Sequence, residues 1–256
     1  GHVDLVRIIL STCATLSEKQ ELVNMRTRPG WTALHVAVER GFLPVVTILL
    51  EEGFADPSAI RLQDGSTSVH VSCTMNTTKH HAILKALIQA IHVRLKSDQA
   101  ATAGKTDVEV RGLLQQVLRK KDTQGFEALN FSIRSPTAMM MLLDHGCDVN
   151  TPGGRDGITP LLQACDSPRP NLCLDVVVRL IARGADVNMP LHATRNSPLH
   201  LAAKSGSLEV IRELLAAGAD PAAKNVGGID AATMARQATH IACAEFIEES
   251  LASRLK

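Results

Sequence analysis

A four-residue pattern recurs six times along the chain, and this repetition constrains the fold more than any other feature of the sequence. Each copy has a Thr-like residue, a small residue, an apolar residue and often a His. The copies begin at Thr32, Thr67, Glu127, Thr159, Ser197 and Asp230. Their starts are separated by 35, 60, 32, 38 and 33 residues. Four intervals near 33 residues indicate a tandem repeat whose units stack on one another, with an insertion in the longest interval.

The sequence around each copy is also periodic. A Gly usually lies two residues before the copy, and a Gly or Asn turn follows it. A second apolar stretch then ends in a pair of large aliphatic residues, such as Leu49-Leu50 or Leu214-Leu215. Several units close with a Gly-Ala-Asp-Val-Asn type of exit. This order of signals predicts two short helices joined by a turn in every unit, with Gly where the backbone needs a positive φ.

These units resemble the ankyrin repeat, and the resemblance covers nearly the whole chain, with the best fit at residues 193–221. It implies an all-α fold: an ankyrin-repeat solenoid of stacked helix-turn-helix units with hairpin or loop fingertips and an inserted helical hairpin. We expect one domain over residues 1–256. It would hold a half repeat at 1–24 and complete repeats at about 27–61, 62–96, 122–150, 154–188, 192–224 and 225–256. The half repeat leads us to expect further sequence upstream.

The longest interval contains two additional helical patterns. Residues 82–96 have apolar side chains at helical spacing, and residues 108–121 return to the same period. The segment between them, 97–107, is small and polar and is predicted to be a loop. We interpret residues from about 89 to 121 as an inserted helical hairpin. The insertion either extends the core by one helix pair or provides a dedicated binding or regulatory element.

Composition excludes several classes of partner. The chain has 27 Lys and Arg against 26 Asp and Glu, so charge gives no reason to expect nucleic acid or an anionic membrane. Aromatic residues, at 2%, are too few for a base-stacking platform. No apolar run approaches the roughly 18 residues that span a bilayer, so we expect no membrane insertion. Six Cys are too few for a disulfide scaffold and favour a reducing intracellular compartment, the cytoplasm first and the nucleus as the alternative.

The histidines and cysteines form no catalytic or metal-binding pattern. His35, His70 and His200 recur because the repeat recurs, and the resemblance implies that this His makes a structural hydrogen bond to the turn backbone. No Cys pair has the spacing of a zinc site. The densest His and Cys cluster, residues 70–81, includes one of these structural histidines. We therefore predict no enzyme activity, no catalytic residue, no metal and no cofactor.

The resemblance implies that partners bind on the concave face of the solenoid. This face is built from fingertips and first helices, and we call it the finger face. Exposed aromatic and Arg side chains are common anchors of interfaces. For Trp31 and Phe126, the alternative is that the side chains fold back onto neighbouring fingertips. Arg195 replaces the turn Gly of its unit. The predicted contact residues are Trp31, Glu39, Arg40, Ser66, Met75, Phe126, Arg134, Arg155, Ile158, Asp166, Arg195, Asn196 and Lys204.

The expected function is a non-enzymatic protein–protein interaction module, a scaffold or adaptor that binds an unidentified protein or peptide, itself a monomer. The alternative is a regulatory or targeting segment of a larger enzyme or channel whose catalytic part lies outside this chain. Asn150 and Asn188 resemble positions that family members offer to asparaginyl hydroxylases. The other interpretation of these two residues is that Asn simply shapes the turn.

Overall fold

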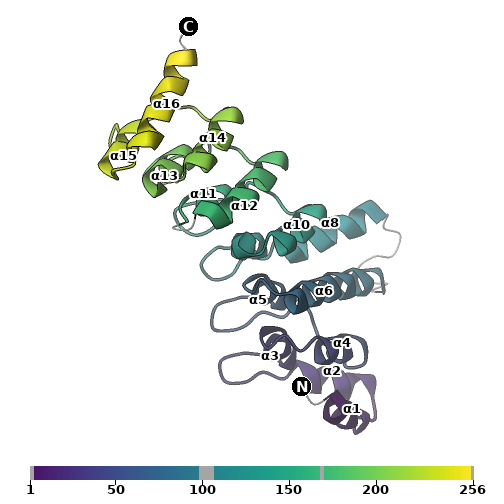
Figure 1. Cartoon of the computed structure of the whole chain (residues 1–256). Coiled ribbons are helices and arrows are strands. Elements are labelled where there is room, and N and C mark those ends of the chain that lie inside the picture. Colours follow the sequence, from purple (N-terminus) through teal and green to yellow (C-terminus); the bar gives the residue numbers. More distant parts are fainter. Residues whose placement is uncertain (1–2, 98–106, 168–169, 255–256) are drawn as a thin grey trace. The chain divides into compact units, whose positions relative to one another are not determined.

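The computed structural model of the chain describes residues 3–97, 107–167 and 170–254. The chain divides into two compact units, Gly1–Cys147 (unit 1) and Asp148–Lys256 (unit 2). Within the described residues, both units consist of helices joined by turns and hairpin loops (Figure 1). Pairing between extended segments is limited there to isolated bridges at fingertips, such as Gly153 with Ile158. The predicted all-α fold class is therefore confirmed.

Unit 1 holds the segments predicted as the first three complete repeats. Its first helices, α3, α5 and α9, pack side by side in that order, while α4 packs on α1 and α6 in a second layer. The helices of unit 1 are α1 (Val3–Ser11), α2 (Leu16–Asn24), α3 (Ala33–Glu39), α4 (Leu43–Glu51), α5 (Ser68–Cys73), α6 (Thr78–Ser97), α8 (Asp107–Leu118), α9 (Ala128–Phe131), the 3-10 helix η1 (Ser132–Arg134) and α10 (Pro136–Asp144).

Unit 2 repeats the same two-layer arrangement. Helix α13 packs between α11 and α15, and α14 packs between α12 and α16. Ala202 and Ala203 on α13 are fully buried, and their small side chains let the neighbouring helices approach closely. The helices of unit 2 are α11 (Pro160–Cys165), α12 (Pro170–Ala182), α13 (Pro198–Ser205), α14 (Leu208–Ala216), α15 (Ala231–Gln237) and α16 (Ile241–Arg254).

Short polar side chains determine where the first helices begin. The residue before α3, α5 and α13 has an extended backbone and carries a hydroxyl. That hydroxyl lies 2.8 Å from Nδ1 of the His three residues later. The backbone N–H of the capping residue donates to the same Nδ1. Because these contacts satisfy polar groups that a helix start leaves free, the Thr/Ser-x-x-His pattern acts as a helix start.

The insertion forms the two helices expected from the sequence. Helix α6 begins at Thr78, earlier than the predicted 82, and α8 ends at Leu118. Both bury an apolar stripe, with Leu84, Leu87 and Ile91 on α6 and Leu114 on α8 almost fully covered. The two helices pack on each other, so the insertion extends the core of unit 1. Most of the predicted loop, residues 98–106, lies outside the described residues.

Helix α2 was not predicted from the sequence. Thr15 is the N-cap of α2, and its hydroxyl accepts from the Glu18 backbone N–H at 3.2 Å. The Glu18 carboxylate in turn accepts from the Ala14 backbone N–H at 2.8 Å. Glu18 thus bonds the residue before the N-cap, whereas in a capping box it would bond the N-cap Thr15 itself. The Thr-x-x-Glu pattern at residues 15–18 is the local signal that could have identified the helix.

The third repeat has the shortest first helix. Helix α9 covers Ala128–Phe131 and continues through η1 to Ser135, the N-cap of α10. The Ser135 hydroxyl accepts from the Ala138 backbone N–H at 3.4 Å. A 3-10 turn thus takes the place of the Gly or Asn turn that links the two helices of the first, second and fifth repeats.

Candidate binding surface

The fingertip hairpins have a fixed backbone because each turns through a left-handed residue. The turn glycines have positive φ, for example 81° at Gly30 and 71° at Gly228. In the fifth repeat the left-handed position is taken by Arg195, with φ of 58°. This confirms that Arg195 replaces the turn Gly. A non-Gly residue in this region is uncommon, so the hairpin and its neighbours hold the Arg195 backbone in place.

The recurring histidines join each first helix to the next fingertip. With Nδ1 accepting at the cap, Nε2 carries the proton and donates to a carbonyl on the following hairpin. His70 Nε2 lies 3.3 Å from the Phe126 carbonyl oxygen, and His200 Nε2 lies 3.0 Å from that of Ile229. Burial lowers the pKa of both histidines, so they are neutral. They hold the fingertips in register and are not available as ligands or bases.

His35 is the exception in this series. Its Nδ1 lies 2.8 Å from the Thr32 hydroxyl, but Nε2 is buried and makes no hydrogen bond within the described part of the chain. Burial, and then the positive charge of Arg61, lower the pKa of His35 to about 4. A second proton on this ring would therefore place a buried positive charge near a guanidinium.

Trp31 folds back onto the neighbouring fingertip. The Arg61 guanidinium lies over the Trp31 ring, 4.6 Å from its centroid, and Arg61 also pairs with Asp64. The nearby Arg26 donates to the carbonyls of Gly30 and Ile60. Trp31 is half-buried as a result. The structure supports the structural interpretation of this side chain, and only part of its ring is left for a partner.

Phe126 is also half-buried, at the third fingertip of unit 1. Its ring packs edge-on against Phe131, with centroids 6.0 Å apart. Phe131 in turn contacts the His70 ring at 5.7 Å. The three rings form one cluster beneath the fingertip. Phe126 therefore combines its two predicted roles, because one side of the ring supports the hairpin and the other faces solvent, where a partner could contact it.

One predicted contact residue is wrong. Ser66 is only 4% exposed. It follows the turn of the second hairpin, where its backbone N–H donates to the Asp64 carboxylate at 3.0 Å. At this fingertip the residue after the turn Gly is therefore too deeply buried to meet a partner.

The ends of the first helices expose a different side chain in each repeat. In unit 1, Arg40, Met75 and Arg134 are exposed at or just after the ends of α3, α5 and η1, which are neighbours in the stack. In unit 2, Asp166 and Lys204 are exposed in the same register, after α11 and on α13. Among the other predicted residues, Arg155 and Arg195 are exposed, whereas Glu39, Ile158 and Asn196 are half-buried.

Asn150 and Asn188 both tie one repeat exit to the next in unit 2. The Asn150 carboxamide accepts from the Asp186 backbone N–H at 2.8 Å and donates to the Gly184 carbonyl at 3.2 Å. Asn188 makes the equivalent pair of bonds with Asp220, at 2.9 Å, and Gly218, at 3.2 Å. These bonds support the interpretation that Asn shapes the turn.

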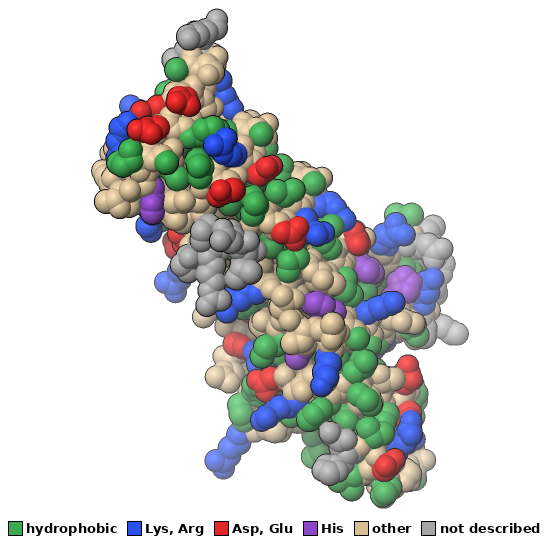
Figure 2. All heavy atoms as spheres, in the orientation of Figure 1, with side chains coloured by type: hydrophobic (Ala, Val, Ile, Leu, Met, Phe, Trp, Pro, Cys, Tyr) green, Lys and Arg blue, Asp and Glu red, His purple; other side chains and the backbone are tan. Residues whose placement is uncertain are grey.

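Lys and Arg are interspersed with Asp and Glu over the face shown in Figure 2. Among the described residues, no group of three or more His, Cys, Asp or Glu is placed to hold a metal ion. No helix in the described ranges is both long enough and apolar enough to cross a membrane.

The six cysteines are free, and five of them are buried. Burial raises the pKa of the Cys73 thiol to about 12 and also raises the pKa of the Cys165 thiol. Since the thiolate is the reactive form, we expect about one thiol per native chain, Cys13, to react rapidly with Ellman's reagent. All six should react after denaturation. Rapid reaction of two or more thiols in the native protein would contradict this packing.

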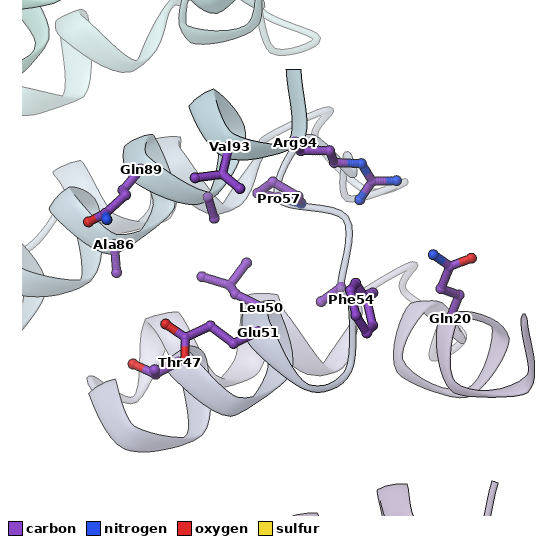
Figure 3. Close-up of a pocket in the computed structure, with 12 residues that line it drawn as sticks. Gln20, Thr47, Leu50, Glu51, Phe54, Pro57, Ala86, Gln89, Val93 and Arg94 are labelled. Carbon is purple, nitrogen blue, oxygen red and sulfur yellow. The ribbon is translucent and has the colours of Figure 1, made fainter. Parts of the chain in front are cut away.

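A groove that the sequence did not predict lies on the other side of unit 1, between the second helices α4 and α6 (Figure 3). Its volume is about 640 Å³. Leu50 points from α4 toward α6, Val93 points from α6 into the same space, and the Phe54 ring stands between the end of α4 and Gln20 of α2 (Figure 3). One sequence signal could have found it: Phe54 is an extra residue between Gly53 and Ala55, where other repeat exits run directly from Gly to a small residue.

Comparison with known proteins agrees with this architecture. The family model for ankyrin repeats matches residues 1–97, 141–225 and 161–249. The B-cell lymphoma 3 protein homolog of Mus musculus is 30% identical over 196 residues, which cover 76% of this chain and 37% of that protein. Human Rabankyrin-5 is 27% identical over 221 residues, covering 83% of this chain and 16% of Rabankyrin-5. The chain thus spans about a third of the length of the first of these relatives and a smaller share of the second.

Solved structures give the same result. The ankyrin repeat domain of Bcl-3 superimposes with a TM-score of 0.69 at 25% identity, covering 96% of this chain and 94% of that domain. The human ASB11 ankyrin repeat domain superimposes with a TM-score of 0.68 at 19% identity, covering 96% and 93%, and supports the fold alone. The repeats, the helix caps and the stacking agree with these matches: the chain belongs to the ankyrin repeat family, and its domain is a protein–protein interaction module.

Proposed function

We propose that the chain binds a protein or peptide along its finger face and acts as a scaffold or adaptor without catalytic activity. The observation that supports this most is the contrast between buried and exposed positions. The buried cap and core positions repeat from unit to unit, whereas Arg40, Met75 and Arg134 differ at equivalent exposed positions of adjacent first helices. A rigid row of differing side chains is suited to recognising one partner surface.

The hairpins contribute rigidity to this face. The left-handed turns and the bonds from His70 and His200 to the next fingertip leave little freedom in the backbone there. Binding therefore costs little ordering entropy, which favours affinity from a modest contact area. The proposed contacts are the exposed predicted residues, together with the solvent-facing parts of Trp31 and Phe126. Ser66 is excluded from the set.

A second candidate role is that of a regulatory or targeting segment in a larger protein. It is favoured by the lengths of the relatives. The chain matches 14% of a transient receptor potential cation channel subfamily A member 1 homolog of Caenorhabditis elegans and 16% of Rabankyrin-5. The two roles share the finger face and differ in what is attached to it. We propose a reducing intracellular compartment for the domain, because six cysteines outside disulfides persist there.

The test is an affinity capture with matched variants. One bait is the chain itself, and a second carries Arg40→Glu, Met75→Asp and Arg134→Glu. A control bait carries Arg212→Glu, Val178→Asp and Arg179→Glu on exposed positions of α12 and α14, with the same change in net charge. We expect the unmodified chain and the control bait to capture the same proteins in similar amounts. The second bait should capture at least about tenfold less of these proteins. Equal capture by all three baits would contradict binding at the finger face, provided that the three share one melting temperature.

A further inference from the structure

The groove between α4 and α6 is a second binding site, distinct from the finger face. We propose that it takes an amphipathic helix of a partner protein, docked through a short apolar stripe and carrying a Lys or Arg against Glu51. This proposal does not depend on the proposed function, because the groove lies on the second-helix layer of unit 1, whereas the finger face is built from first helices and hairpins.

The groove is formed by departures from the regular repeat. Helix α2, which the repeat pattern does not contain, contributes Gln20 at one end. The part of α6 that runs past the end of α4 contributes Val93 and Arg94 at the same end. Between them lies the extra residue Phe54. Three irregular features thus meet at one groove. The remaining lining residues come mainly from α4 and α6, the packed second helices of the first two complete repeats.

Phe54 has an unusual backbone for its position. At the exits of later repeats the left-handed residue is a glycine: Gly146, Gly184 and Gly218 have φ of 82°, 84° and 95°. In the first complete repeat Phe54 takes that conformation, with φ of 54°, although Gly53 is its neighbour. Phe54 is nevertheless 43% exposed. A bulky residue in a strained conformation that gains little burial contributes little to folding, and such sites are enriched where proteins bind ligands.

The shape of the groove suits a helix. Ala86 and Ala90 lie one turn apart on α6 and form a shallow strip, so the backbone of another helix can approach closely. Leu50 on one wall and Val93 on the other offer apolar contacts, and Val93 is 57% exposed. Residues 86–94 span about 12 Å at 1.5 Å per residue, which corresponds to about two turns of a docked helix. Apolar residues at i, i+4 and i+7 of the partner would match this length.

The charge of the groove selects a basic partner at one point. Helix α4 ends at Glu51, Glu52 is its C-cap, and its last turn has no basic residue. Glu52 pairs with Arg7 at 3.1 Å, whereas Glu51 has no ion-pair partner within the described residues. The carbonyl end of a helix already carries partial negative charge, so Glu51 is unfavourable where it stands. A partner cation beside Glu51 relieves this repulsion. At the far end Arg94 lies 3.7 Å from Asp56.

The experiment uses designed helical peptides of about 15 residues, long enough to be partly helical in water. The probe is fluorescein-labelled and has Leu at i, i+4 and i+7 and Lys at positions flanking this stripe. Three further peptides replace the Leu residues by Ser, the Lys residues by Glu, or a central residue by Pro. Binding to chain 1–256 is measured by fluorescence anisotropy. We expect the Leu/Lys probe to bind with a Kd below about 100 μM and the three others to bind at least about tenfold more weakly.

Variants of the chain locate the site. Ala90→Trp should fill the groove and weaken the probe at least about tenfold, while Ala216→Trp, at an exposed site on α14, should not. Glu51→Lys should weaken the Lys probe and strengthen the Glu peptide, while Glu213→Lys in the last turn of α14 should change neither. The bait carrying Arg40→Glu, Met75→Asp and Arg134→Glu should bind the probe like the unmodified chain.

Several results would overturn the proposal. It fails if the probe does not bind below about 1 mM, or if Ala90→Trp binds as tightly as Ala216→Trp. Equal binding of the Pro peptide would show that an extended segment occupies the groove and would reject the helix. Loss of binding in the variant changed at Arg40, Met75 and Arg134 would show that the probe binds the finger face and not the groove. Failure here leaves the capture experiment unaffected, because its variants do not touch the groove.

Discussion

Replacing Gly30 by Ala should destabilise unit 1 by about 3 kcal/mol, whereas the same change at Gly228 should cost about 1 kcal/mol. Both glycines are fingertip turn residues with positive φ, 81° and 71°, so both substitutions carry the cost of a left-handed Ala. They differ in their surroundings. A Cβ at Gly30 would lie 2.5 Å from the Leu62 Cβ and 2.6 Å from the Leu62 backbone nitrogen, whereas a Cβ at Gly228 would meet nothing within 4 Å.

Urea denaturation followed by circular dichroism measures this difference. The Leu62 side chain is 65% exposed and can move aside, but its backbone cannot move without disturbing the second hairpin. The first unfolding transition of the Gly30 variant should therefore shift to clearly lower urea than that of the Gly228 variant. Equal shifts in the two variants would show that the first fingertip, with Gly30, does not pack against Leu62 of the second fingertip.

Lowering the pH from 6.5 to 4 should remove about 3 kcal/mol of stability through His35 alone. Burial and the nearby Arg61 lower the pKa of His35 from 6.5 to about 4 in the folded chain. Between these values the unfolded chain binds a proton that the folded chain does not, so stability falls as the pH falls. Above pH 6.5 this contribution is fully present. The pKa values of His70 and His200 are lowered as well, so they act in the same direction.

His35→Asn is the variant that isolates the effect. The third repeat already has Asn130 at the equivalent position, where its carboxamide oxygen accepts from the Glu127 backbone N–H at 3.0 Å. Asn can therefore keep the cap without a titrating group. Urea unfolding at pH 7, 6, 5 and 4 should show a shallower fall in stability for His35→Asn than for the unmodified chain. Identical pH dependence in the two proteins would mean that His35 is hydrated in the folded state.

Most of the helices could be predicted because their signals are local. The Thr or Ser cap and the His three residues later lie within one helical turn. A turn glycine or an apolar doublet can likewise be recognised from its immediate neighbours in the sequence. The inserted helices were found in the same way, from a stripe of Ile and Leu at helical spacing. Helix α2 carries an equally local signal, the Thr-x-x-Glu pattern at residues 15–18, which the repeat pattern obscured.

The candidate site could be predicted only in part. The register of the repeat located the helix ends at Arg40, Met75 and Arg134, which are exposed. It did not give the environment of a fingertip side chain, because neighbouring hairpins come from segments about 30 to 60 residues apart. Trp31 is half covered by Arg61 of the neighbouring hairpin for this reason, and the burial of Ser66 was likewise not foreseen.

The sequence by itself determined the family, the order of helices and the residues that cap them, since each depends on side chains within about four positions of one another. Tertiary structure alone decided which surface positions remain open to a partner. Phe54 and Val93 lie far apart in the chain and meet at one groove only because α4 and α6 pack together. Exposure is a property of contacts between distant segments, and no local pattern encodes it.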